Sequence, residues 1–178
     1  MSVAMGNNRI QQVNWEDELY REIIMDHYAN PRHVGDVANA DITVHGVNPL
    51  CGDDLKLSAS VRAGSLKDLK IHTKGCSISQ ASSSIMAEAL YGKTLAEAQT
   101  LVSQFKAMML EGKPASSLPP PLADAQALEG VKDYPVRIKC ALLAWNSALQ
   151  GLTEFARKKS KISTSVTEKT EDDVYGKQ

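Results

Sequence analysis

The sequence is organised around residues 48–53, which read Asn48-Pro49-Leu50-Cys51-Gly52-Asp53. This stretch places a thiol and a carboxylate two residues apart. Pro49 fixes its own φ angle and has no N–H group to donate, so we expect a turn here rather than a central strand. Gly52 allows the backbone to bend sharply between the two side chains. The stretch therefore predicts a turn that presents two candidate metal ligands, Cys51 and Asp53.

The chain has two further cysteines, Cys76 and Cys140. An odd number of cysteines does not suit a secreted disulfide framework, and in a reducing cytoplasm a cluster of thiols indicates metal binding or catalysis. If both meet near Asp53, three sulfurs and one oxygen are enough donors for one tetrahedral zinc ion. If they do not meet, each cysteine is a small buried hydrophobic residue.

Alternating apolar residues on both sides of the turn predict a small β-sheet. Ile42 and Val44 indicate a first strand, residues 55–61 a second and residues 69–73 a third. Residues 63–65 read Ala-Gly-Ser and predict a hairpin turn between the last two. The expected sheet is a three-stranded antiparallel meander with one polar face and one face covered by helices.

The order of these strands bears on the thiols. In a meander the third strand ends where the second begins, so Cys76 is expected near Asp53. Cys76 also stands at the start of a predicted helix, where N–H groups and the helix dipole lower a thiol pKa. Cys140 lies in the early turns of the last helix, beside Lys139 and one turn after Arg137. We expect these cations to favour the thiolate.

Helical spacing of apolar residues, with breakers and caps at the ends, predicts an N-terminal helix, two central helices and a long C-terminal helix. Their expected ranges are about 15–29, 77–91, 95–111 and 135–158, with Ser77 and Thr94 as candidate N-caps. Residues 115–123 are rich in proline and predict a stiff surface loop, followed by a helical turn over 123–128. The fold class is therefore α+β. We expect a flexible arm over 1–13, one domain over 14–158 and a disordered tail over 159–178.

Composition narrows the classes of function. The net charge of −1 does not indicate a general basic surface for nucleic acid. No apolar run approaches the roughly 20 residues of a membrane span, and residues 1–13 lack the apolar core of a secretory signal, so we expect a cytoplasmic protein with no membrane partner. His27 and His33 are interpreted as packed side chains. A cysteine hydrolase is disfavoured because no histidine belongs to the motifs that hold the thiols.

Four ordered motifs resemble the NifU/IscU superfamily across about residues 15–150. They lie at residues 19–32, 48–53, 75–79 and 137–145. Within the superfamily the chain is similar to the SufU branch. Lys139 stands where scaffold proteins of the IscU type carry a histidine, and residues 115–130 fit the insertion of the SufU branch.

The resemblance implies an α+β fold with zinc on Cys51, Asp53, Cys76 and Cys140. It implies that Cys51 accepts persulfide sulfur from a PLP-dependent cysteine desulfurase of the SufS type, for a downstream iron–sulfur assembly complex. Arg137 is implied to act near the zinc site. Such a protein is a sulfurtransferase-like acceptor rather than a conventional enzyme. Two alternatives stay open: a scaffold that assembles and transfers a [2Fe–2S] cluster on the same thiols, and a non-catalytic zinc adaptor.

Overall fold

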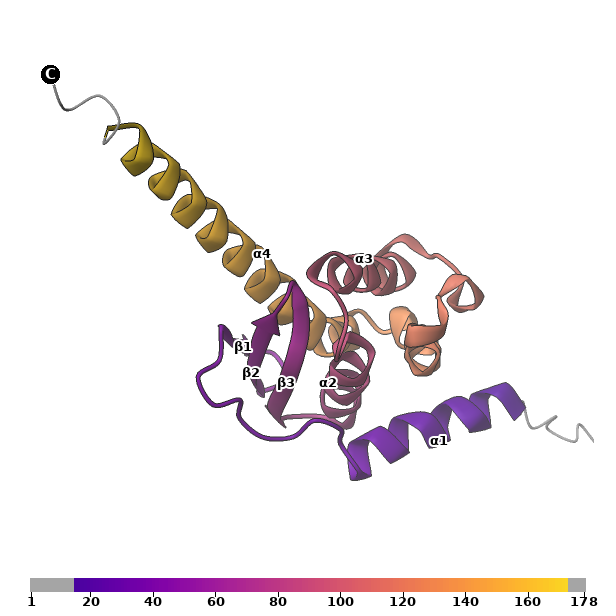
Figure 1. Cartoon of the computed structure of the whole chain (residues 1–178). Coiled ribbons are helices and arrows are strands. Elements are labelled where there is room, and N and C mark those ends of the chain that lie inside the picture. Colours follow the sequence, from indigo (N-terminus) through magenta and orange to yellow (C-terminus); the bar gives the residue numbers. More distant parts are fainter. Residues whose placement is uncertain (1–14, 173–178) are drawn as a thin grey trace, which may run out of the picture.

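The computed structural model describes residues 15–172, in which a three-stranded sheet lies beside a group of helices (Figure 1). The strands are β1 (Ile42–Asn48), β2 (Asp53–Arg62) and β3 (Ser65–Lys74). The α-helices are α1 (Trp15–Ala29), α2 (Ser77–Leu90), α3 (Leu95–Glu111) and α4 (Pro135–Asp172). Short 3₁₀ helices, η1 (Ala115–Ser117), η2 (Pro120–Leu122) and η3 (Asp124–Asp133), connect α3 to α4.

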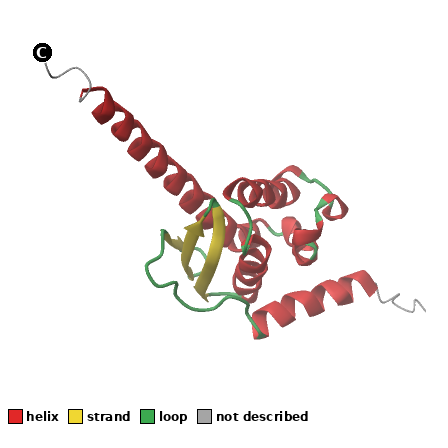
Figure 2. Cartoon of the chain, in the orientation of Figure 1, coloured by secondary structure: helices red, strands yellow, loops and turns green. Residues whose placement is uncertain are grey.

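The sheet is the predicted antiparallel meander, in the order β1-β2-β3. Its first pair closes the turn, because Asn48 at the end of β1 pairs with Asp53 at the start of β2. The alternating residues of β2, Leu55, Leu57 and Ala59, are buried on the face that α2 and α4 cover (Figure 2). The predicted α+β fold, with an N-terminal helix and a long C-terminal helix, is confirmed.

Close packing between β1 and α4 brings two distant parts of the chain to the site. Gly46 lies where a Cβ atom would overlap the Ser147 hydroxyl of α4, so only glycine allows this approach. On its other side α4 is held by Trp145, whose ring stacks on Phe105 with centroids 4.1 Å apart. The Trp145 Nε1–H donates to Ser82 Oγ of α2 at 3.0 Å. The start of α4 is thereby fixed beside the end of β1.

The starts of α2 and α3 show one prediction corrected and one confirmed. The N-cap of α2 is Cys76 rather than Ser77, because Cys76 has an extended backbone and its Sγ accepts the Ser79 N–H. The predicted N-cap of α3, Thr94, is confirmed, and it forms a capping box in which Thr94 and Glu97 accept each other's backbone N–H groups. Sulfur at an N-cap is unusual, and it ties one candidate ligand to a helix end.

Two further expectations need correction. Residues 115–123 lie at the surface as predicted, since Ser116, Ser117, Pro120 and Pro121 are exposed. They form two 3₁₀ turns, however, and the apolar side chains Ala115, Leu118 and Leu122 are buried, which the prediction of a plain loop missed. The last helix also does not end at Lys158 but continues to Asp172. The sequence from 159 to 172 contains no glycine or proline, so no strong helix breaker follows. The domain limits themselves stay a prediction, and the expected arm over 1–13 lies outside the described residues.

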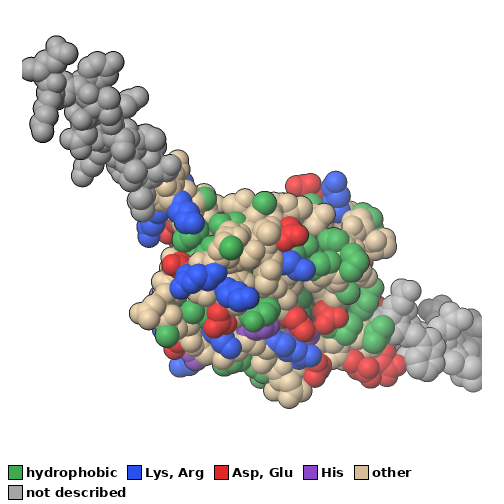
Figure 3. Space-filling model, viewed as in Figure 1, with side chains coloured by type: hydrophobic (Ala, Val, Ile, Leu, Met, Phe, Trp, Pro, Cys, Tyr) green, Lys and Arg blue, Asp and Glu red, His purple; other side chains and the backbone are tan. Residues whose placement is uncertain are grey.

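No helix within residues 15–172 combines the length and the apolar content that crossing a bilayer requires. On the face shown in Figure 3, basic and acidic side chains are interspersed over the described part of the surface. This distribution agrees with the net charge of −1 and leaves the thiols as the most distinctive chemistry of the chain.

Candidate metal centre

Three of the four predicted ligands converge on one point. The candidate donor atoms of Cys51, Asp53 and Cys140 all lie within 4.8 Å of one another. They come from the β1–β2 turn, the start of β2 and the second turn of α4. A tetrahedral zinc ion with Zn–S bonds of about 2.3 Å holds its sulfur ligands about 3.8 Å apart. Binding would therefore require only a small contraction of this group.

Cys76 lies at the same place but outside that tight group. Its backbone N–H donates to Asp53 Oδ1 at 3.0 Å, and it lines a hollow of about 460 Å³ together with Cys51 and Cys140. Cys51 is exposed, Cys76 is partly buried and Cys140 is buried, and none forms a disulfide. The meander thus brings Cys76 to Asp53 as predicted, whereas its role as a ligand stays a prediction.

The Asp53 carboxylate is held from two sides. Its side chain is buried, with Oδ1 accepting the Cys76 N–H and Oδ2 accepting the Asn48 amide at 3.3 Å. Gly75 provides the room, because a Cβ atom at this position would overlap the carboxylate. Gly75 also has φ +146°, a conformation that other residues rarely adopt. Each carboxylate oxygen keeps a free lone pair, so the group can still bind a cation.

The electrostatics of Cys140 differ from our expectation. Burial raises the pKa of the Cys140 thiol well above its usual range, and its neighbours Cys51, Asp53 and Cys76 act in the same direction. The expected thiolate is therefore wrong for the metal-free protein. The physical reason is that the Arg137 side chain is exposed to solvent, whereas the thiol is buried beside a carboxylate.

This donor set fits zinc. Three thiols and a carboxylate are ligands that zinc accepts in tetrahedral sites. Asp53 and Cys140 are buried beside each other, and no basic side chain of the described residues lies within 4.0 Å of the carboxylate. A dication would supply positive charge here and displace the thiol proton. A side chain at Gly75 would occupy the space that the Asp53 carboxylate fills. The glycine backbone therefore allows the carboxylate to lie beside the thiols.

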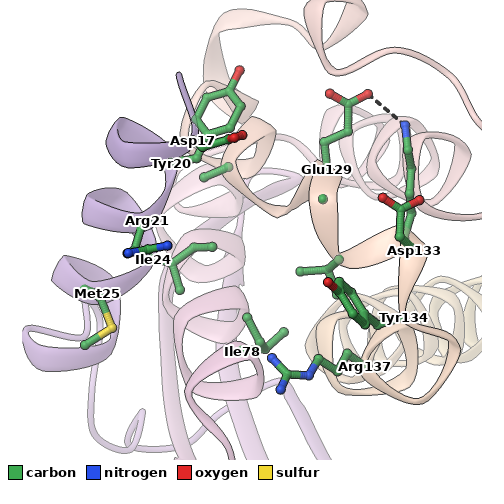
Figure 4. Close-up of a pocket in the computed structure, with 14 residues that line it drawn as sticks. Asp17, Tyr20, Arg21, Ile24, Met25, Ile78, Glu129, Asp133, Tyr134 and Arg137 are labelled. Atoms are coloured by element: carbon green, nitrogen blue, oxygen red, sulfur yellow. Dashed lines mark hydrogen bonds and ion pairs between the residues drawn. The ribbon is translucent and has the colours of Figure 1, made fainter. Parts of the chain in front are cut away.

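Arg137 lies at the rim of the thiol hollow. Its guanidinium stands over the Tyr134 ring, 5.7 Å from the ring centroid. A second hollow of about 650 Å³ lies between α1 and η3 (Figure 4). Ile78, Tyr134 and Arg137 line this hollow and the thiol hollow as well. The two hollows therefore adjoin, with Arg137 between them.

A second group of metal-type ligands consists of His27, Glu88 and Asp124. The buried His27 ring has both nitrogens occupied: Nε2 lies 3.1 Å from Asp124 Oδ2 and Nδ1 lies 2.8 Å from Ser84 Oγ. An ionised carboxylate only accepts, so in the neutral ring Nε2–H donates to Asp124 and the Ser84 hydroxyl donates to Nδ1. The Arg32 guanidinium lies 3.8 Å from Glu88. His27 is thus the packed side chain that the sequence predicted.

His33 lies apart from both groups. Its ring stacks on Tyr91 with centroids 4.6 Å apart, and burial lowers the pKa of its imidazole. It too is interpreted as a packed side chain.

Sequence reasoning missed Asn48 and Gly75. Asn48 has a signal in the sequence, because Ile42, Val44, Gly46 and Asn48 share one side of the first strand and only the last is polar. A polar residue at an inward position needs a buried partner. Gly75 has no comparable signal in the sequence. Its role comes from the close approach of the Asp53 carboxylate, which is visible only in the folded chain.

Comparison with known proteins places the chain in a family. Residues 19–141 match the model of the NifU-like N-terminal domain. The chain belongs to this family. It is 41% identical over 138 residues to the zinc-dependent sulfurtransferase SufU of Bacillus subtilis, covering 78% of this chain and 92% of that protein.

Two further members extend the comparison. The iron–sulfur cluster assembly scaffold protein IscU of Streptococcus pyogenes is 33% identical over 153 residues, covering 85% of this chain and 94% of that protein. The crystal structure of a NifU-like protein from Brucella abortus superposes with a TM-score of 0.72 at 27% identity, covering 80% of this chain and 97% of that one. The NifU-like fold thus extends over most of the described residues.

Proposed function

We propose that this protein is a zinc-dependent sulfur acceptor in iron–sulfur cluster assembly. Cys51 would take persulfide sulfur from a PLP-dependent cysteine desulfurase of the SufS type and pass it to a downstream assembly complex. The observation that carries the proposal is the placement of one exposed thiol against a buried carboxylate and a buried thiol, all within 4.8 Å. The similarity to a relative named as a zinc-dependent sulfurtransferase supports it.

Cys51, Asp53, Cys76 and Cys140 would hold the zinc ion. When bound, zinc would keep the thiols deprotonated and protect them from oxidation. The burial of Cys140 and Asp53 suits them to stay in place, since neither is open to a partner. The exposed Cys51 is the thiol that a partner protein can reach.

Sulfur transfer then follows the chemistry of thiol–disulfide exchange. The Cys51 thiolate attacks the terminal sulfur of the desulfurase persulfide. One S–S bond forms on Cys51, the S–S bond of the donor breaks, and the donor cysteine leaves as a thiolate. The number of S–S bonds is unchanged, so no external oxidant or reductant is needed. Arg137, at the rim of the hollow, would attract the anionic persulfide.

The test is to trap the intermediate. The zinc-loaded protein is incubated with the desulfurase and cysteine, alkylated, digested and analysed by mass spectrometry. We expect one added sulfur atom on Cys51 and a stimulated desulfurase, with both lost in Cys51→Ala. Full stimulation by Cys51→Ala, or a persulfide confined to another cysteine, would contradict the proposal.

A cluster scaffold is the second candidate, because the same thiols suit a [2Fe–2S] cluster and a relative at 33% identity is named as a scaffold. Lys139, exposed beside Cys140, offers no imidazole to such a cluster. Anaerobic reconstitution followed by ultraviolet–visible spectroscopy separates the two: a stable, transferable cluster favours the scaffold. A non-catalytic zinc adaptor would bind zinc but acquire no sulfur on Cys51.

A further inference from the structure

We propose that Asn48 is a positioning residue of the metal centre, whose side-chain amide holds Asp53 and Cys140 in place and leaves Cys51 free. This inference rests on the proposed function, because it assigns Asn48 to the same zinc site. It goes further by naming a residue that would bind no metal and yet determine how well the site binds one.

Asn48 links three elements at one point. It is the last residue of β1 and only 6% of its surface is exposed. Its Nδ2 lies 3.3 Å from Asp53 Oδ2 on β2 and 3.5 Å from Cys140 Sγ on α4. A single amide group thus contacts two predicted ligands that are 87 residues apart in the sequence, counted from 53 to 140.

The chemistry of these neighbours fixes the orientation of the amide. An ionised Asp53 only accepts hydrogen bonds, and a metal-bound Cys140 thiolate does so as well. Asn48 has two N–H bonds on Nδ2, one for each acceptor. The reverse orientation would place a carbonyl oxygen against two negative groups. The amide is therefore suited to the deprotonated, metal-binding state of both partners.

The hydrogen bonds are distributed unequally over the four predicted ligands. Asp53 accepts two hydrogen bonds, from the Asn48 amide and from the Cys76 N–H. Cys140 Sγ accepts one from the Asn48 amide. Cys76 Sγ accepts one from the Ser79 N–H at 3.4 Å. No N–H group within residues 15–172 donates to Cys51 Sγ. N–H donors withdraw charge from a thiolate and restrict its movement. Asn48 thereby restrains Asp53 and Cys140 but not Cys51, whose sulfur is the least restrained of the three thiols.

The test compares zinc affinity in the isolated, full-length protein. Asn48→Leu keeps the branched shape of the side chain but cannot donate, and Asn48→Ala removes it. Asn146→Ala makes the same change at an exposed position of α4 and serves as the matched control. Affinity is measured by competition with a chromogenic chelator, and the ligand field by the absorption spectrum of the cobalt(II)-substituted protein.

We expect the control to match the wild type and both Asn48 variants to bind zinc about 10- to 100-fold more weakly, the usual loss when a ligand loses its outer hydrogen-bond partner. Their cobalt(II) spectra should shift, which a defect of packing alone would not cause. Affinity of Asn48→Leu within twofold of the wild type, with an unchanged spectrum, would overturn the inference. Circular dichroism of the metal-free variants checks their fold, and either variant that folds suffices for this comparison.

Failure of the inference and failure of the proposed function are distinguishable. If the wild type binds zinc and Asn48→Leu binds equally well, the role of Asn48 is refuted and the zinc site stands. If the wild type binds no zinc, the proposed function itself fails, and the inference fails with it.

Discussion

The thiol site and the His27 cluster contain similar numbers of metal-type ligands but differ in what already occupies them. In the His27 cluster, both ring nitrogens have partners within the protein, and the side chains of Glu88 and Asp124 are about half exposed. In the thiol site, the carboxylate of Asp53 is buried. No cation of the described residues lies within 4.0 Å of it.

The difference lies in the balance of charge after the internal bonds are counted. Arg32 stands beside Glu88, and Asp124, about half exposed to solvent, accepts the Nε2–H of His27. Within residues 15–172, Asp53 has hydrogen-bond donors but no basic side chain within 4.0 Å, and burial raises the pKa of the neighbouring Cys140 thiol, which disfavours a second anion there. A cluster of metal-type ligands that has no neighbouring positive charge thus indicates a metal centre. A cluster whose ligand atoms already have partners in the protein indicates a structural network.

Removing one carboxylate from each cluster should reveal the difference between the two most clearly. Structural zinc binds with about 10–16 kcal/mol over four ligands, so one ligand is worth about 2.5–4 kcal/mol. We expect Asp53→Ala to lower zinc affinity by about 70- to 900-fold, the ratio that corresponds to this free energy. Asp124→Ala, the matched control, should leave it unchanged. Metal analysis after desalting measures both, and undiminished zinc in Asp53→Ala would remove Asp53 from the ligand set.

The His27 cluster should contribute more to the stability of the fold than the exposed thiol of Cys51. His27 is buried and joins α1 to α2 and η3, so His27→Ala should lower the free energy of unfolding by about 2–3 kcal/mol through a cavity and the lost hydrogen bonds. Cys51→Ala, at an exposed thiol, should change it by less than about 0.5 kcal/mol in the metal-free protein. Urea unfolding with chelator present measures both. His27→Ala should retain zinc, and its loss together with the fold intact would make the second cluster a metal site.

The sequence alone predicts most of the sheet and part of the site. Alternation along Leu55, Leu57 and Ala59 identifies β2 and its buried face, because a strand has a side-chain period of two. A meander then requires Cys76 to return to Asp53, and the structure confirms this with the hydrogen bond from the Cys76 N–H. These features depend on local pattern and on strand order, which a single sequence contains.

What the sequence could not predict depends on burial and on close approach. Arg137 and Lys139 closely precede Cys140 in the sequence, but their side chains are exposed while the thiol is buried, so the predicted direction of its pKa shift was wrong. Gly75 acquires its role from a carboxylate 22 residues earlier, at Asp53. The end of α4 was misplaced because a polar composition was interpreted as disorder, although residues 159–172 contain no glycine or proline to end the helix.

Gly75 allows the geometry of the thiol site to be tested without removing a ligand. Gly75→Ala places a Cβ atom against the Asp53 carboxylate and forces alanine into a positive φ, so we expect a loss of about 1–3 kcal/mol in stability together with weaker zinc binding. Gly130→Ala is the matched control, because its Cβ would meet no atom within 4 Å. Thermal unfolding and chelator competition measure the two effects. Equal behaviour of the two variants would mean that the close approach at Gly75 does not shape the site.

The smallest expected effect is a pH dependence that belongs to the thiol site alone. The pKa of Cys140 is raised in the folded, metal-free protein, whereas in the unfolded chain the pKa of this thiol is about 8.5. Below that pH both states keep the proton, so Cys140 adds no pH dependence. Above it the unfolded state loses the proton and the folded state does not, so stability falls as pH rises, by at most roughly 1.4 kcal/mol per pH unit.

The fall in the free energy of unfolding should be visible in urea unfolding with chelator between about pH 8.5 and 10. Cys140→Ala should reduce the slope of this free energy against pH. Asn146→Ala, at an exposed position of the same helix, should keep the wild-type slope. Zinc should remove the dependence in this range, because the zinc-bound state has already released the thiol proton and the unfolded state has lost it as well. Below about pH 8.5, the stability of the zinc-bound protein should instead rise with pH, because zinc binding displaces the thiol proton. An equal slope in the Cys140→Ala and wild-type proteins would show that the buried thiol does not set the charge balance by which the thiol site differs from the His27 cluster.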